Sequence, residues 1–257
     1  MIELLAAMAI LVLITLFVGR LFSDASRIWK LGNRRVANAM DGRAVIDFMV
    51  REMSSAIADD TLVMVHDVDA DKQILGMDSD RMYFLSADQL AQKTARDRVY
   101  RQVKQVSYHI APMLDLNNDP IAGRYRIVRN GVENMFAEDS YYNPIFTCYT
   151  DPSWWTKSCM NDDTESGSSV TLAENVRTLE FWVYDQNGVL RAGQDYNSKD
   201  HGPPGWIEIY IELLGEDDAV KAALLSGQAA IDLADRSSRR YVGRVYFNNG
   251  RGYAPDS

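Results

Sequence analysis

The chain has 257 residues, of which 47% are hydrophobic and 25% are charged, so it can form one large domain or two small ones with a true core. The formal net charge is −9 at pH 7. Phosphate binding relies on clustered Lys and Arg, and the densest basic groups here are the pairs Arg34-Arg35 and Arg239-Arg240. This composition argues against nucleic acid as the main partner.

The first predicted element is an apolar run at the N-terminus. Sixteen consecutive uncharged residues run from Leu4 to Gly19, and Thr15 is their only polar member. A membrane-spanning helix needs ~20 apolar residues. A cleavable signal peptide is the alternative, but the run lacks a preceding basic residue and a good small-x-small cleavage site. We therefore predict an uncleaved membrane helix over residues 1–22, with an apolar surface that includes Leu4, Leu5, Met8, Ile10, Leu11, Leu13, Ile14 and Phe17.

The helical pattern continues after this run. Apolar residues recur at spacings of three and four at Ile46, Met49, Val50, Met53 and Ile57, which is typical of one buried stripe on a helix. We expect residues 23–57 to be an amphipathic continuation of the first helix. Gly32 and Gly42 are points where it could bend.

Strand patterns dominate residues 58–257. Seven segments rich in β-branched and aromatic residues occur at 61–68, 81–87, 98–110, 123–131, 177–188, 205–214 and 240–250. Two of them, 177–188 and 205–214, alternate between apolar and polar residues. This alternation predicts an antiparallel sheet with one buried face.

Two stretches interrupt the strands. Residues 132–170 form a polar excursion, and residues 216–235 predict a short helix inserted before the last strand. The excursion holds the only two cysteines, Cys148 and Cys159, which form either a disulfide outside the cytoplasm or two unrelated thiols. Its aromatic residues, Tyr141, Tyr142, Trp154 and Trp155, either form a binding patch or pin the loop to the sheet. The predicted class is α+β, a long N-terminal helix packed on an antiparallel β-sheet domain.

The segment "MIELLAAMAILVLI" resembles the N-terminus of type IV pilin-like proteins, whose mature chains begin with Phe-Thr-Leu-Ile-Glu-Leu-Leu or close variants. Residues 2–5 align with Ile-Glu-Leu-Leu, which leaves two residues and the short basic leader without a counterpart. We interpret this as a start codon placed at an internal Met, or as a chain shortened to begin there. The resemblance implies a pilin-like fold and prepilin-type N-terminal methylation after cleavage by prepilin peptidase, if the natural chain is longer.

In this family the glutamate is thought to pair with the N-terminal ammonium of a neighbouring subunit. A carboxylate in hydrocarbon costs ~2.5–3.5 kcal/mol on insertion scales, so a carboxylate that persists there is expected to have a function. The resemblance therefore makes Glu3 an assembly residue that sets subunit register. The alternative is that Glu3 lies in the headgroup layer at the end of the span.

The similarity extends further along the chain. "RAVIDFMVREMSSAI" is similar to the stretch that closes the long helix in minor pseudopilins. "AENVRTLEFWVYDQNGVL" resembles a strand-turn unit of the J-type minor pseudopilin of type II secretion and of W-type minor pilins, and "GWIEIYIELL" and "RYVGRVYF" occupy the places of their last strands. The Verru_Chthon cassette protein C group is a further relative that the size and the insert suit.

Catalytic and metal-binding motifs give little signal. The three histidines, His66, His109 and His201, are far apart in sequence, and no nucleophile, phosphate-loop or zinc motif occurs. Asp67, Asp69 and Asp71 have the spacing that begins an EF-hand loop, but Lys72 stands where that loop needs Gly. They are weak calcium candidates, and we expect no cofactor, no metal and no enzymatic activity.

Together these observations predict a non-catalytic minor pilin or pseudopilin of a type II secretion or type IV pilus-like filament, at its tip or in its initiation complex. Its expected partners are other pilin-like subunits and the inner-membrane assembly platform. It would cross the inner membrane once, with its C-terminal domain in the periplasm or outside the cell. The alternatives are an anchored enzyme and a membrane-tethered adhesin-like module that uses residues 132–170.

Overall fold

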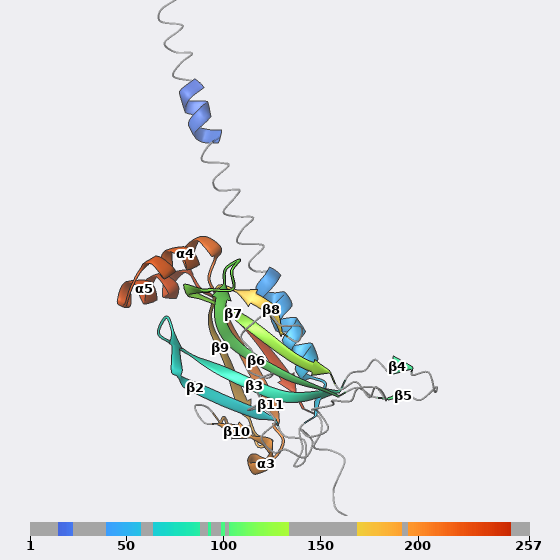
Figure 1. The fold of residues 1–257 in the computed structure, drawn as a ribbon. Helices are drawn as coiled ribbons and strands as arrows, with labels where there is room; N and C mark the ends of the chain where they lie inside the picture. The colour runs from blue at the N-terminus through green and yellow to red at the C-terminus, as the bar shows by residue number, and fades with distance from the viewer. Residues whose placement is uncertain are drawn as a thin grey trace, which may run out of the picture. The chain divides into compact units, whose positions relative to one another are not determined.

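The computed structural model describes residues 15–22, 40–57, 64–87, 92–93, 99–100, 103–133, 169–191 and 195–247 (Figure 1). The chain divides into two compact units, Met1–Asp41 and Gly42–Ser257. In the first unit, residues 15–22 are helical and their side chains are exposed. The second unit contains all the labelled strands and helices.

The labelled elements of the second unit follow in chain order. The strands are β1 (Ala56–Ile57), β2 (Val65–Ile74), β3 (Met77–Ala87), β4 (Gln92–Lys93), β5 (Val99–Tyr100), β6 (Val103–Leu114), β7 (Pro120–Glu133), β8 (Ser169–Glu174), β9 (Val176–Tyr184), β10 (Tyr196–Asn197), β11 (Trp206–Leu213) and β12 (Arg239–Tyr246). The helices are α3 (Ser198–His201), α4 (Glu216–Leu224) and α5 (Gln228–Ser237), in addition to helical residues 42–53.

The described strands form two main antiparallel sheets, where the sequence predicted one. The larger sheet has the order β10-β2-β3-β6-β7-β8, with β1 added beside β3, and the smaller has the order β12-β11-β9. Strands β4 and β5 pair separately. The mixed helix and antiparallel-sheet class was expected, but alternation along single strands does not reveal how they divide between sheets.

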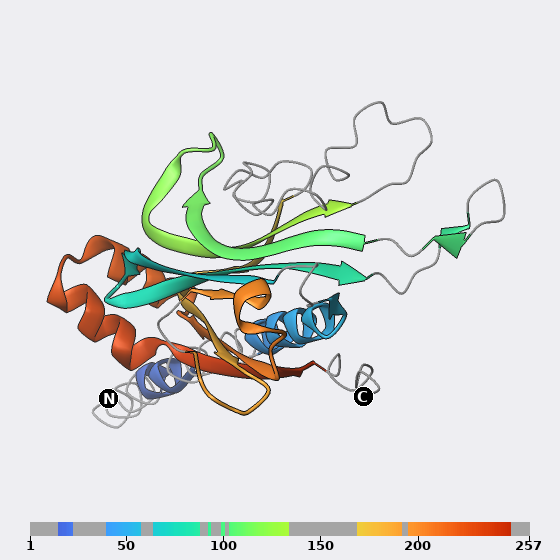
Figure 2. The same ribbon diagram turned by 90° about the horizontal axis from the view of Figure 1, so that it is seen from below.

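The core lies between the two sheets. Fully buried side chains from the larger sheet, such as Phe84 and Ile127, share one cluster with Leu179, Phe181 and Ile209 of the smaller sheet. A buried hydrogen bond also joins the sheets, because the backbone N–H of Phe181 donates to Oδ2 of Asp80 at 2.8 Å. The two sheets and the helix of residues 42–53 therefore share one core (Figure 2).

The helix approaches the smaller sheet closely because two glycines remove side-chain bulk at the contact. A Cβ on Gly243 of β12 would lie 2.6 Å from Ile46 and 2.7 Å from Val50, and a Cβ on Gly42 would lie 2.5 Å from the Tyr241 ring. Gly42, which the sequence suggested as a bend, thus allows an aromatic ring to lie against the helix backbone. Both glycines have the same role on opposite sides of one interface.

The helix ends at Met53, four residues earlier than the predicted boundary. The hydroxyl of Ser54 donates to the carbonyl of Arg51 at 2.7 Å, and that of Ser55 donates to the carbonyl of Glu52 at 2.7 Å. Serine hydroxyls compete for helix carbonyls in this way and favour termination. The chain then forms strand β1, in which Ile57 is paired with Leu85 of β3.

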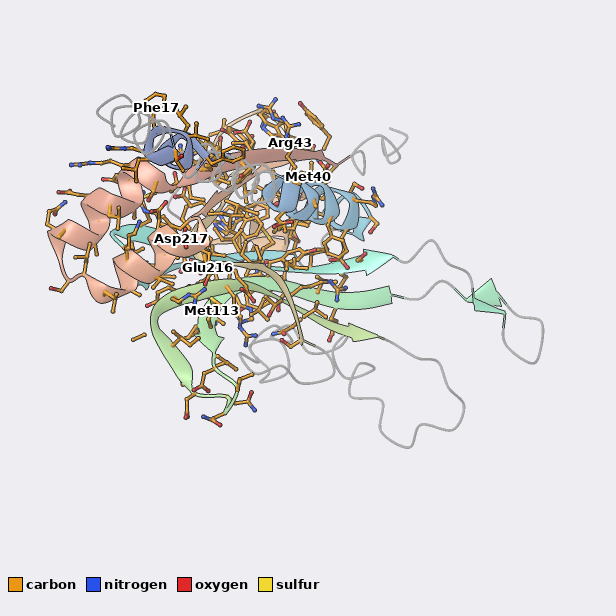
Figure 3. The ribbon with its side chains drawn as sticks, turned by 90° about the horizontal axis from the view of Figure 1, so that it is seen from above. Phe17, Met40, Arg43, Met113, Glu216 and Asp217 are labelled. Atoms are coloured by element: carbon orange, nitrogen blue, oxygen red, sulfur yellow. The ribbon has the colours of Figure 1, made fainter. Side chains whose placement is uncertain are left out.

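The predicted single helix at 216–235 is a pair of helices, α4 and α5. Their separation follows from Gly227, which has φ +57° and is the N-cap residue just before α5. Glu216 is the first residue of α4 (Figure 3). Arg124 of β7 ties the pair to the larger sheet, because its Nη2 lies 2.7 Å from Oε2 of Glu216. Arg177 of β9 ties the pair to the smaller sheet, because its Nη2 lies 2.5 Å from Oδ1 of Asp235.

Candidate interaction surfaces

Most residues of the predicted assembly helix lie outside the described residues. This group comprises Glu3, Leu4, Leu5, Met8, Ile10, Leu11, Leu13 and Ile14, and the cysteines Cys148 and Cys159 also fall outside. Phe17 is described and is 65% exposed. Among the described residues, none of the helices combines the length and apolar character that crossing a bilayer requires.

The predicted packing stripe lies in the core of the second unit. Met49 and Met53 are fully buried, Ile46 is buried, and Val50 packs against the same cluster. Ile57 belongs to β1 instead of the helix, and nothing further is described of its side chain. Val45, which the spacing analysis did not include, is also buried.

A charged network joins the helix to the larger sheet. Glu52 accepts hydrogen bonds from Nε of Arg129 at 2.9 Å and from its Nη2 at 2.5 Å, and the hydroxyl of Tyr108 also donates to Glu52. Tyr108 belongs to β6 and is fully buried, whereas Arg129 belongs to β7. Glu52 is not part of the apolar stripe that the spacing predicts, and no local sequence pattern indicates these partners.

The network changes the ionisation of its members. Burial raises the pKa of Tyr108 well above its usual value, and the adjacent Glu52 carboxylate raises it further. Burial acts to lower the pKa of Arg129, but hydrogen bonding to Glu52 outweighs it and the pKa is raised. Tyr108 therefore stays neutral and Arg129 stays charged, so the pair remains a donor set for Glu52 across the physiological pH range.

The histidines are distributed over separate elements. His66 of β2 and His109 of β6 are each 1% exposed, whereas His201 of α3 is exposed. Nε2 of His66 lies 2.9 Å from Oδ2 of Asp80, the carboxylate that joins the two sheets. His66 thus belongs to the packing between the sheets.

The calcium candidates lie on strand β2. Asp67 is opposite Arg81 and Asp69 is opposite Ser79 in the β2–β3 pairing, and Asp71 follows on the same strand. An EF-hand places its ligands on a loop that curls around the ion, whereas these aspartates occupy alternate positions of an extended strand. Within the part of the chain that the structure describes, no group of three or more potential ligands is arranged for a metal.

The outer face of the smaller sheet is rich in aromatic and charged side chains. We use this name for the side of β9, β11 and β12 that points away from the core. Its members are Glu180, Trp182, Tyr184, Trp206, Glu208, Tyr210, Glu212, Arg240, Val242, Arg244 and Tyr246.

Aromatic rings on this face contact one another across the strands. Tyr184 stacks on Trp206 with ring centroids 4.6 Å apart, and Trp182 packs against Tyr210 with centroids 4.3 Å apart. Tyr246 extends the first pair onto β12, where it is 60% exposed. Trp and Tyr in such partly exposed positions are typical of protein contact surfaces.

A buried carboxylate lies within this aromatic set. Glu208 is 7% exposed, accepts a hydrogen bond from the hydroxyl of Tyr210 at 2.5 Å, and is paired with Arg244. Burial alone would raise its pKa, but these two donors lower it below the usual value. For Tyr210, burial and the Glu208 carboxylate raise the pKa to about 12. The face is therefore a preorganised polar and aromatic surface.

The comparisons with known proteins assign no family. No protein-family model matches the chain, and no curated protein matches it. Among solved structures, a type IV-like pilin from Thermus thermophilus is similar over 82% of this chain and 95% of that chain, with 8% sequence identity and a TM-score of 0.41. A likeness at that identity and score carries no functional argument.

Proposed function

We propose that the chain is a non-catalytic pilin-like subunit that assembles through its N-terminal helix into a filament of the type IV pilus or type II secretion class. The observation that carries this proposal is Glu3 immediately before sixteen uncharged residues. In the proposal this segment holds the subunit in the inner membrane with the domain on its outer side, and the partners are other pilin-like subunits and an assembly platform. Its strands resemble those of J-type minor pseudopilins and W-type minor pilins, and this resemblance favours a minor subunit at the filament tip or in an initiation complex.

The helix of residues 42–53 supports this proposal. It supplies buried side chains to the core and is joined to the larger sheet by an ion pair, so it cannot separate from the domain without exposing Met49 and Met53. A subunit that is moved by its N-terminal helix needs such a connection to its domain. An anchor that serves only as a tether needs none.

The test is to replace Glu3 by Ala in the full chain and to measure copurification with pilin-like subunits from membranes. A carboxylate in a low-dielectric helix bundle is offset by a positive charge only in the correct stagger, so we expect assembly to be lost while the domain stays folded. Leu11→Ala is the control, since it removes apolar area from the same helix without changing charge. Normal assembly of the Glu3→Ala variant would reject the register role.

A second observation is independent of mutagenesis. The proposal expects an in-frame basic segment ending in Gly-Phe-Thr directly upstream of Met1 in the genome. An upstream sequence without such a segment would count strongly against a pilin-like subunit. It would instead favour a tethered binding domain or an anchored enzyme.

A further inference from the structure

We propose that the outer face of the smaller sheet binds an arginine side chain of a protein partner, at a site formed by Glu180, Trp182 and Tyr210. This proposal goes beyond the proposed function. It depends only on described residues of the domain, and its test is independent of whether the N-terminal helix assembles into a filament.

The first argument is an unbalanced carboxylate. Three glutamates lie on this face, and two have arginine partners within the sheet: Glu208 pairs with Arg244, and Glu212 pairs with Arg240 at 2.7 Å. Among the described residues, Glu180 accepts hydrogen bonds from Nε1 of Trp182 at 3.1 Å and from Oγ1 of Thr178 at 3.4 Å. No described basic side chain lies within ion-pair distance of it.

The strand register shows how the row of Glu180 differs from the rows beside it. In those two rows a glutamate of β11 lies opposite an arginine of β12, Glu208 opposite Arg244 and Glu212 opposite Arg240. In the row of Glu180 the carboxylate is on β9, the β11 position is Tyr210 and the β12 position is Val242. Val242 is 53% exposed, so the row of Glu180 has an open apolar position where its neighbours carry a guanidinium.

The second argument is the pair of rings beside this carboxylate. Trp182 and Tyr210 pack at 4.3 Å with a 42° angle between their planes, and both remain partly exposed. A guanidinium is planar and weakly hydrated, so it can stack on an aromatic ring while donating hydrogen bonds to a carboxylate. The indole N–H of Trp182 holds Glu180 next to the ring, which prepares both contacts at once. An ammonium group lacks the planar shape for this combination.

The third argument concerns how a partner can reach this site. The backbone N–H of Phe181 donates to Asp80, and the carbonyl of Val183 accepts from the N–H of Arg191 at 2.8 Å. These bonds occupy two of the backbone groups of β9 near Glu180 that an added partner strand would use, which opposes strand addition there. Recognition through side chains is therefore favoured. The net charge of −9 would also steer a basic partner toward the chain.

The experiment titrates the full chain, in non-ionic detergent and labelled with 15N at its five tryptophan indoles, with the peptide acetyl-Gly-Arg-Gly-amide. The Trp182 signal is identified by its loss in the Trp182→Phe variant. We expect this signal to shift saturably with the arginine peptide up to about 50 mM. The same peptide with citrulline, which has the shape of arginine without its charge, should not shift it.

Two variants make the test specific. Glu180→Gln should weaken binding about three- to tenfold, as expected for a partly exposed ion pair combined with a cation–π contact. Glu174→Gln, which removes an exposed carboxylate from β8 of the other sheet, should leave the affinity unchanged. The remaining indole signals report that each variant is folded. The proposal is overturned if the citrulline peptide shifts Trp182 equally, if both glutamine variants weaken binding alike, or if Trp182 does not respond.

Discussion

The ion pair between the helix and the larger sheet gives the sharpest stability prediction. Glu52→Ala removes the acceptor of two Arg129 donors and of the Tyr108 hydroxyl, and it leaves a guanidinium with a side chain only 16% exposed. Breaking a fully buried ion pair costs about 3–5 kcal/mol. Because both partners keep some solvent contact, we expect a loss of about 2–3 kcal/mol in the free energy of unfolding.

The measurement is urea unfolding of the full chain in detergent, followed by tryptophan fluorescence. A companion thermal scan should show a Tm lower by roughly 5–10 °C. Arg51→Ala is the matched control, because Arg51 is exposed on the same turn of the helix. A double-mutant cycle with Arg129→Met isolates the coupling between the two partners. The ion pair does not hold the helix if the losses in the free energy of unfolding of Glu52→Ala and Arg129→Met simply add in the double variant. The same conclusion follows if Glu52→Ala lowers this free energy no more than Arg51→Ala does.

Three further predictions concern the rest of the domain. Gly123→Ala should destabilise the chain by about 1–3 kcal/mol in urea unfolding, since φ is +70° and the new Cβ would lie 3.0 Å from the Ala223 backbone. Gly227→Ala is the control, because Gly227 also has a positive φ but open space around its Cβ position, and this variant should destabilise the chain less. Gly243→Val should lower the Tm, because the new side chain would displace the helix at Ile46 and Val50. A Tm equal to that of the natural chain would mean that the helix and β12 can move apart there at little cost. The pKa of Glu208 is lower in the folded state than its ordinary value of 4.5. The ionised Glu208 therefore adds to the free energy of unfolding above pH 4.5, and this addition is lost as the pH falls from 4.5 through the folded-state pKa. Urea midpoints of Glu208→Gln should therefore be less sensitive to pH below 4.5 than those of the natural chain, and equal sensitivity would contradict the assignment.

The sequence predicts local elements of this fold well because local periodicity reflects burial. The alternation of 177–188 and 205–214 matches β9 and β11, in which Leu179, Phe181, Ile207 and Ile209 face the core. The three-and-four spacing of the helix likewise coincides with buried Met49 and Met53. These patterns depend only on which side of an element faces water.

The features that the sequence did not predict depend on contacts between distant segments. Glu52 and Arg129 are 77 positions apart, and a polar residue beside an apolar stripe looks the same whether it meets solvent or a partly buried arginine. The division of strands into two sheets is set by pairing across the fold, which alternation along one strand does not encode. Gly42 looked like a bend because the Tyr241 ring that lies against it comes from the last strand.

The shared core of helix and sheets leads to a final prediction about cooperativity. Val45, Ile46, Met49 and Met53 belong to the same cluster as Leu179 and Ile207, so the helix cannot open without exposing the inner faces of both sheets. Glu52→Ala should therefore accelerate amide hydrogen exchange by the same factor, about 30- to 150-fold, in the helix and in β11. If the ion pair were a local latch, only helix amides would exchange faster and β11 would keep its protection. Equal acceleration is the behaviour required of a domain that is moved as one body through its helix, whereas selective acceleration would mean that force on the helix peels it from the sheets.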